Sequence, residues 1–221
     1  MTKVAFRILI ADDHEIVRRG LKAILSAQGD WEVVGEALTG REAVEQTRER
    51  KPDIVIMDIG MPDLNGLEAT RQILKEFPGI EVLILTMHES EQLIREVLDT
   101  GARGYVLKSD AGRDLVAAVD ALRRHKPYFT TKVSEMVLTG YLRGVPPREE
   151  PEDAPRLRLT GREREIVQLL AEGKSNKEVA SSLNISVKTA ETHRARIMAK
   201  LGLRSIGELV RYAVRNGMVE P

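Results

Sequence analysis

Residues 54–58 read IVIMD, a run of aliphatic side chains that ends at the carboxylate of Asp58. Such a run is typical of a strand buried on both faces of a parallel sheet. The sequence therefore predicts a buried strand with a chemically active side chain at its end. Three further runs in the first half of the chain end in the same way: Ile8 to Ala11 before Asp12 and Asp13, Val82 to Leu85 before Thr86, and Gly104 to Leu107 before Lys108.

Helix-period segments separate these runs, so the pattern alternates between strand and helix. Strict alternation predicts an α/β domain, doubly wound around a five-stranded parallel sheet. Ligands of such sheets bind at the carboxyl ends of the strands, so we expect the polar side chains to converge on one pocket. The expected strands are 7–11, 31–37, 53–58, 81–86 and 103–107, and the expected helices are 14–27, 40–50, 65–76, 90–99 and 112–124.

The converging side chains suit a divalent cation and a phosphoryl group. Carboxylates are oxygen ligands for a hard cation such as Mg²⁺. An ammonium and a hydroxyl can neutralise and position an anionic phosphoryl group, and such positioning supplies most of the catalysis of its transfer. Taken singly, an Asp at a strand end is often a helix cap and a Lys there is often a solvated charge. Their joint order along the chain favours a shared site.

Length and composition indicate a globular chain with room for two domains. The chain has 221 residues, of which 31% are charged and 42% hydrophobic. It contains no run of about eighteen apolar residues and no secretion leader, so we expect a cytoplasmic protein with no membrane partner. Cys is absent, which excludes disulfides and thiolate ligands.

Charge and proline content divide the chain. From residue 159 onward there are 11 Lys or Arg against 7 Glu and no Asp, a net charge of +4 that the rest of the chain offsets with −4. A basic module favours an anionic partner. Residues 144–158 hold four Pro among charged residues and are typical of an extended linker, and residues 131–142 favour a short extra helix. The predicted parts are 1–126, 127–158 and 159–221.

The last part carries start and stop signals for four helices and no strand. Gly202 is expected to end the third helix, which extends to about residue 200. Four helices without a strand predict a small all-α domain. The starts are marked by Thr160 with Glu163, Ser175 with Glu178, Ser186, and Ser205 with Glu208.

The third of these helices has two distinct faces. Helical spacing buries Ala190, Ile197 and Leu201 on one stripe. The opposite face presents Lys188, Glu191 and Thr192, which can read base edges in the major groove of double-stranded DNA. A solvated helix face is the alternative for any one residue, but the +4 charge and the flanking caps favour DNA. The expected phosphate contacts are Thr189, Arg196, Ser175, Asn176, Lys177 and Ser186.

The last helix and the histidines lead to two further expectations. The last helix has Leu209, Tyr212 and Ala213 on one stripe, which is a candidate dimer contact. His14, His88 and His125 are scattered at element ends, so we expect no histidine metal site. His193 lies near the buried stripe of the third helix, where packing and phosphate contact are both open.

The strand-end motifs resemble the receiver domain of two-component response regulators, a flavodoxin-like fold. The resemblance covers residues 6 to about 125 and includes Asp12-Asp13, MDIGMP at 57–62 with Gly66, Thr86, and GYVLK at 104–108. It implies that a sensor histidine kinase transfers a phosphoryl group to Asp58. It also implies that Mg²⁺ is held by Asp13, Asp58 and the Gly60 carbonyl, with Asp12 acting through water.

The same resemblance implies a switch. Lys108 would balance phosphoryl charge and the Thr86 hydroxyl would donate to a phosphoryl oxygen. Alternation along the strand places Tyr105 at the surface beside the fourth helix, from where it would turn inward when Thr86 moves. One departure is Ser109, where many receivers have a Pro.

The C-terminal part resembles the four-helix DNA-binding domain of LuxR and FixJ proteins, a domain of helix-turn-helix type, over residues 159–217. The motifs are LTGRE at 159–163, GKSNKEVA at 173–180 and ISVKTAETH at 185–193. Together the two halves resemble NarL/FixJ response regulators. This resemblance implies a transcription regulator that forms homodimers when phosphorylated and whose only catalysis is transfer to its own Asp.

Two other classes share some of these parts. Phosphohydrolases of the haloacid-dehalogenase type use a similar Asp, Thr and Lys, but they need a second Asp two residues after the nucleophile, where this chain has Gly60. A ligand-sensing LuxR-type regulator would share the C-terminal domain, but it would need neither the carboxylates nor Mg²⁺.

Overall fold

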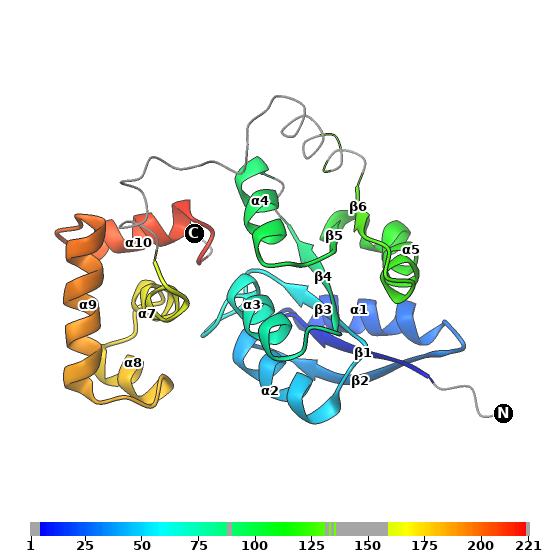
Figure 1. Ribbon diagram of the computed structural model, residues 1–221, viewed down its shortest axis with the longest axis horizontal. Coiled ribbons are helices and arrows are strands. Elements are labelled where there is room, and N and C mark those ends of the chain that lie inside the picture. The colour runs from blue at the N-terminus through cyan, green and yellow to red at the C-terminus, as the bar shows by residue number, and fades with distance from the viewer. Residues whose placement is uncertain (1–4, 88–89, 131–132, 134, 136–158, 220–221) are drawn as a thin grey trace. The chain divides into compact units, whose positions relative to one another are not determined.

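The computed structural model describes residues 5–87, 90–130, 133, 135 and 159–219 (Figure 1). The chain forms two compact units, residues 1–139 and 140–221, and each is considered by itself. Of the expected extra helix at 131–142, only Val133 and Glu135 are among the described residues. The expected linker at 144–158 lies outside them.

The first unit is built on a parallel sheet with the strand order β2-β1-β3-β4-β5-β6. The doubly wound α/β fold is thereby confirmed, and the predicted strands and helices agree with the structure to within about two residues at their ends. The strands are β1 (Phe6–Ala11), β2 (Trp31–Ala37), β3 (Ile54–Asp58), β4 (Glu81–Thr86), β5 (Gly104–Leu107) and β6 (Tyr128–Phe129). The helices are α1 (Glu15–Ser26), α2 (Gly40–Arg50), α3 (Gly66–Glu76), α4 (Glu91–Asp99) and α5 (Ala111–Arg123), with a 3-10 turn at Lys108–Asp110.

The sheet has one strand more than predicted. β6 is only two residues long and pairs with β5, with Tyr105 opposite Phe129. A two-residue strand shows no periodicity, so the sequence pattern could not reveal it. The extra strand covers the edge of β5 that would otherwise be exposed.

Two apolar layers sandwich this sheet. α1 and α5 cover one face, where Ile8, Ile56 and Leu83 pack against Leu25 and Leu115. α2, α3 and α4 cover the other face (Figure 1). The alternate strand residues, such as Leu9, Val55 and Ile84, pack there. Because both faces are covered, the central strands carry continuous apolar runs, as the sequence indicated.

Tyr105 lies beside α4 as expected, but the prediction that it faces the surface is wrong. Its side chain is 0% exposed and belongs to the same cluster as Ile94 and Val97 of α4. Phe129 of β6 packs against this cluster, and the buried Val133 is a member of it. Phe129 of the unexpected strand and Val133 therefore cover the face of Tyr105 that was expected to be exposed.

Gly66 opens α3 directly behind the end of β3. A Cβ at this position would lie 1.8 Å from the carbonyl oxygen of Asp58, so only glycine allows the two backbones to approach so closely. The Gly66 backbone N–H donates to the Ile59 carbonyl over 3.0 Å. This contact fixes the backbone that carries Asp58.

The second unit consists, in its described part, of the helices α7 (Gly161–Ala171), α8 (Asn176–Ser182), α9 (Val187–Leu201) and α10 (Ile206–Arg215). Both predicted capping boxes are present, at Thr160 and at Ser175. Gly202 ends α9 with a left-handed φ of 66°, as predicted. Ala190 and Ile197 of α9 are buried in the core of this unit, and Leu201 packs against it.

The stripe on α10 does not face outward. Leu209 and Ala213 are both 0% exposed, and Tyr212 packs against the same core. Leu209 and Ala213 therefore serve the core of their own unit, and a dimer contact through α10 stays a prediction. The stripe periodicity identified a buried face correctly but not what it packs against.

Candidate functional site

The strand register gathers the predicted side chains at one edge of the sheet. Met57 of β3 lies opposite Ala11 of β1, so Asp58 ends its strand beside the residues that follow β1. Asp58 lies opposite Leu85, one residue before Thr86. The three side chains that end these strands are buried, with exposed fractions of 1% for Asp12, 4% for Asp58 and 3% for Thr86.

Lys108 holds two of the carboxylates together. It follows β5, and its Nζ lies 2.8 Å from Asp12 Oδ2 and 3.0 Å from Asp58 Oδ2. Both contacts join opposite charges and are ion pairs. A buried ammonium between two buried carboxylates leaves one negative charge in excess before Asp13 is counted.

This crowding changes the acidity of the site. Burial raises the pKa of Asp58 from 3.8 to about 6, Lys108 opposes this shift, and the charges of Asp12 and Asp13 add to it. Burial lowers the pKa of Lys108, but the ion pairs with Asp12 and Asp58 outweigh burial and raise it above its usual value. With a pKa of about 6, the Asp58 carboxylate binds a proton more tightly than an ordinary Asp does, and a cation would likewise relieve its excess negative charge.

The site fits a divalent cation. Asp12, Asp13, His14 and Asp58 can each offer one ligand atom, and these atoms lie within 4.8 Å of one another. Carboxylate oxygens are suitable ligands for Mg²⁺. Gly60, whose carbonyl the sequence suggested as a further ligand, follows β3 and is partly exposed. His14, which the sequence did not connect with the carboxylates, lies in this cluster beside Asp13. The absence of a histidine metal site stays a prediction.

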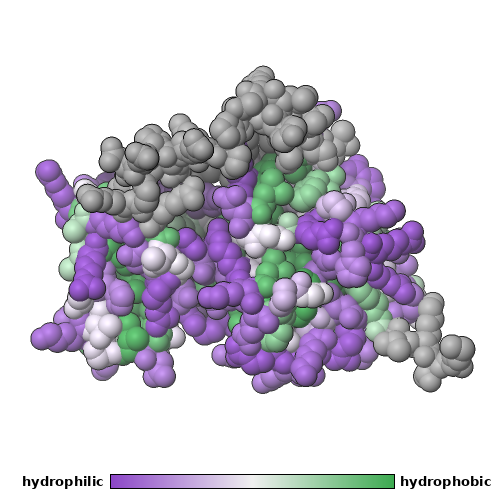
Figure 2. Space-filling view, in the orientation of Figure 1, coloured by the Kyte–Doolittle hydropathy of each residue, from purple (hydrophilic) through white to green (hydrophobic). Residues whose placement is uncertain are grey.

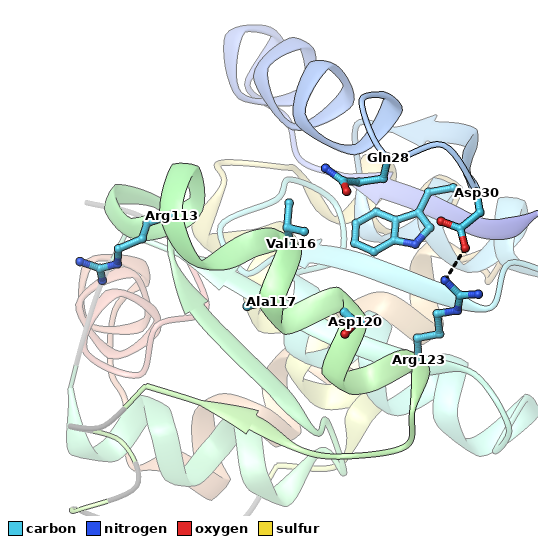
Figure 3. A pocket seen from close by; sticks show the side chains of 8 residues that line it. Gln28, Asp30, Arg113, Val116, Ala117, Asp120 and Arg123 are labelled. Carbon is cyan, nitrogen blue, oxygen red and sulfur yellow. Dashed lines mark hydrogen bonds and ion pairs between the residues drawn. The ribbon is translucent and has the colours of Figure 1, made fainter.

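A second hollow of about 560 Å³ lies between α5 and the turn before β2 (Figure 3). Its charges are already paired, because Arg123 contacts Asp30 and Arg113 contacts Asp114, each over 2.8 Å. It is wide open and lies away from the acidic cluster, so its volume does not make it the functional site. Its lining consists of Gln28, Asp30, Trp31, Arg113, Val116, Ala117, Asp120 and Arg123.

The predicted DNA-reading face of α9 is exposed. Lys188, Glu191 and Thr192 all lie outside the core, on the side away from Ala190 and Ile197. The Thr192 hydroxyl donates to the Lys188 carbonyl over 2.8 Å, which leaves its methyl group as the part available for an apolar contact. The remaining predicted contacts are Ser175, Lys177, Ser186, Thr189 and Arg196, which are exposed, and Asn176, which is partly exposed.

Three of those helix-start residues are already engaged. Ser175 accepts from the Glu178 backbone N–H over 3.3 Å and caps α8. Ser186 accepts from the Thr189 backbone N–H over 3.1 Å and therefore caps α9. Asn176 accepts from Arg194 over 3.4 Å, a contact that links α8 to α9. Sequence reasoning placed these residues correctly at helix starts but could not show the link between the two helices.

Comparison with known proteins identifies the class. The response regulator receiver domain matches residues 8–120, and the luxR family of bacterial regulatory proteins matches residues 157–213. The chain belongs to the two-component response regulators that carry a LuxR-type DNA-binding domain. The receiver match excludes the ligand-sensing alternative, and the family consists of regulators rather than classical enzymes.

Particular relatives cover almost the whole chain. The oxygen regulatory protein NreC of Staphylococcus carnosus (strain TM300) is 40% identical over 215 residues, which is 97% of this chain and 99% of that protein. A solved structure of the response regulator RcsB from Salmonella typhimurium has 29% identity and a TM-score of 0.63, and the match covers 96% of this chain and 98% of that one. Another, of RcsB from Salmonella enterica serovar Typhimurium bound to a promoter with the phosphomimetic BeF3⁻, has 29% identity and a TM-score of 0.59, with 94% and 98% covered.

The described surface is mostly hydrophilic on the face seen in Figure 2, with apolar side chains visible between polar ones. Within the described segments, every helix is too short or too polar to cross a lipid bilayer.

Proposed function

We propose that Asp58 accepts a phosphoryl group from the phosphohistidine of a sensor histidine kinase and thereby controls DNA binding by α9. The observation that carries this proposal is the buried cluster in which Lys108 contacts both Asp12 and Asp58. In the reaction, a carboxylate oxygen of Asp58 forms a bond to phosphorus while the bond from phosphorus to the kinase histidine breaks. We place the regulator in the cytoplasm, with residues 127–158 as the segment between its domains.

The residues around Asp58 have separate tasks. Asp13, Asp58 and the Gly60 carbonyl would hold Mg²⁺ directly, and Asp12 would hold it through water. When bound, Mg²⁺ supplies charge neutralisation for the entering phosphoryl group. Lys108 contributes a fixed positive charge at the other side of the carboxylate. Gly60 offers no acid or base where a phosphohydrolase has its second Asp, so the acyl phosphate persists long enough to act as a signal.

The switch couples this chemistry to the fold. Thr86 would move toward the phosphoryl group so that its hydroxyl donates to a phosphoryl oxygen. This movement of Thr86 would change the packing of the buried Tyr105 against α4. To shift the ratio of active to inactive receiver from 1:99 to 99:1, the phosphoryl group must stabilise the active form by about 5.5 kcal/mol relative to the inactive form. The active form then dimerises and occupies paired half-sites on DNA.

α9 would read the operator through Lys188, Glu191 and Thr192, since these side chains are exposed near its N-terminal end. Lys188 suits guanine acceptors, Glu191 suits the cytosine amino group, and the Thr192 methyl suits thymine. The exposed residues at the helix starts, and Arg196, would contact phosphates and set the register.

The proposal is tested by measuring binding of the full chain to promoter DNA with and without acetyl phosphate and Mg²⁺. Wild type should bind more tightly after treatment, and Asp58→Asn should not respond. Asp53→Asn is the matched control, because Asp53 precedes the other end of β3 and its Oδ2 accepts only an exposed backbone contact from Arg7. A response that persists in Asp58→Asn, or one that is lost in Asp53→Asn as well, would contradict the proposed acceptor.

A further inference from the structure

The function proposed above gives no role to His14, yet this residue lies against the carboxylates of the acidic cluster. Its Nδ1 is 2.7 Å from Asp13 Oδ1 and 3.4 Å from Asp12 Oδ1. The other oxygen of Asp12 contacts Lys108. Asp12 Oδ1 is therefore the oxygen that does not contact Lys108 and could face a cation, and it lies beside the imidazole.

Helix formation does not explain where the imidazole lies. His14 is the N-cap residue of α1, but its side chain makes no capping hydrogen bond. Its backbone N–H donates to Asp12 Oδ1 over 2.9 Å, which fixes the residue next to the cluster. The side chain is about half exposed, at 56%, so it is accessible to an ion that enters from solvent.

The distances from His14 Nδ1 to Asp12 and Asp13 can be compared with the spacing of ligands around one ion. Ligand atoms about 2.1 Å from a cation lie about 3.0 Å apart at neighbouring corners of an octahedron and about 3.4 Å apart in a tetrahedron. The distances from His14 Nδ1 to Asp13 Oδ1 and Asp12 Oδ1, 2.7 and 3.4 Å, lie on either side of the octahedral spacing, and the longer one equals the tetrahedral spacing. The 4.8 Å limit on all pairs is close to the roughly 4.2 Å between opposite corners of the octahedron.

A nitrogen donor changes which cation a site prefers. Oxygen ligands suit Mg²⁺, whereas imidazole suits the later transition ions, whose affinity for nitrogen sites also follows a rising order. We propose that His14 is a nitrogen ligand that gives this receiver a selective affinity for a divalent transition ion of the Co²⁺ or Zn²⁺ class over Mg²⁺. This inference rests on the proposed cation site at Asp13 and Asp58 and specifies which ions that site takes.

The chain is well suited to a direct test. It has no Cys and four His, so no thiolate site competes for the added ion. Co²⁺ and Mg²⁺ are titrated separately into the untagged full chain by calorimetry. In His14→Ala the affinity for Co²⁺ should fall at least about tenfold, since even an outer-shell partner of a ligand contributes about 10- to 100-fold. The affinity for Mg²⁺ should change less than about twofold, because its ligands are oxygens.

His125→Asn is the matched control. It removes another imidazole, which contacts Glu81 rather than the acidic cluster, and Asn tolerates the left-handed φ of 55° at that position. This variant should keep the affinities of wild type for both ions. An equal loss of Co²⁺ affinity in His14→Ala and in His125→Asn would overturn the inference.

A second measurement identifies the ligand itself. Pulsed electron paramagnetic resonance of the Mn²⁺-loaded wild-type chain should show hyperfine coupling to an imidazole nitrogen, and His14→Ala should bind Mn²⁺ without it. Bound Mn²⁺ with no nitrogen coupling in wild type would overturn the role of His14 while leaving the carboxylate site in place. Undiminished binding in Asp13→Ala would instead contradict the cation site on which the proposed function depends.

Discussion

Removing the charge of Asp58 should stabilise the receiver when no divalent cation is present. The pKa of Asp58 is raised from 3.8 to about 6, chiefly by burial. The folded state therefore binds the proton more tightly than the unfolded state, and the stability that this provides is full below pH 3.8 and is lost as pH rises through about 6. A difference of about two pH units corresponds to roughly 3 kcal/mol at about 1.4 kcal/mol for each unit.

Asp58→Asn has no such loss, because the amide does not ionise. Near pH 4 the variant and wild type should have similar free energies of unfolding. Near pH 8 the variant should be more stable by up to about 3 kcal/mol, since Lys108 keeps Asp12 as a partner. This sign is opposite to that expected for an Asp stabilised by its ion pair, for which the Asn variant would be the weaker protein at pH 8.

Urea unfolding followed by fluorescence is a suitable assay. The chain has one Trp, and Trp31 packs against the core of the receiver, so its emission reports the unfolding of this unit alone. The measurement is made in a chelator from pH 4.5 to 8, and Mg²⁺ should then stabilise wild type more than the variant. A stability difference that stays constant over this range, or an Asn variant that is less stable at pH 8, would refute the reasoning.

Three further predictions concern the cation, the DNA and the backbone. Asp13→Ala should weaken Mg²⁺ binding, measured by calorimetry, far more than Asp12→Ala, because a ligand that acts through water contributes less. Lys188→Ala should cost about 1–3 kcal/mol of binding free energy for the cognate operator, measured by fluorescence anisotropy. In the same assay Lys177→Ala should weaken binding to all DNA sequences, and the slope of log affinity against log salt concentration should become shallower by about one. Gly66→Ala should destabilise the receiver by about 1–3 kcal/mol in urea and slow its phosphorylation, because the added Cβ collides with the Asp58 carbonyl.

Each of these predictions has a result that contradicts it. Equal losses of Mg²⁺ affinity in the two Asp variants would remove the distinction between direct and water-mediated ligands. Identical effects of the two Lys variants on all sequences would show that α9 does not read bases. Gly20→Ala is the control for the glycine, because a Cβ there meets no atom within 4 Å. A Gly66→Ala variant as stable as this control would contradict the close approach.

The sequence predicted the fold well where local patterns repeat. Apolar runs such as Ile54 to Met57 are strong signals, because burial on both faces leaves no polar position in them. The carboxyl ends of parallel strands meet at one edge, so the order of Asp12, Asp58 and Lys108 was enough to predict that they converge. The capping boxes predicted the helix starts of the second unit for a similar local reason.

Other features depend on contacts between distant segments, which no local pattern records. Tyr105 is buried because β6 and the residue at 133 close over its face, and neither is visible in the alternation of β5. The stripe on α10 indicated burial but not the partner, which is the core of its own unit. His14 was not assigned to the cluster because the sequence shows only that it lies at a helix start, whereas the structure turns its side chain toward Asp13.

The central claim, that Asp58 is the phosphoryl acceptor, is tested most directly by mass spectrometry of the full chain after incubation with acetyl phosphate and Mg²⁺. Wild type should gain one phosphoryl group, located in the peptide that contains Asp58, and Asp58→Asn should gain none. Labelling of the variant to the same extent, or a phosphoryl group found on another residue of wild type, would contradict the account.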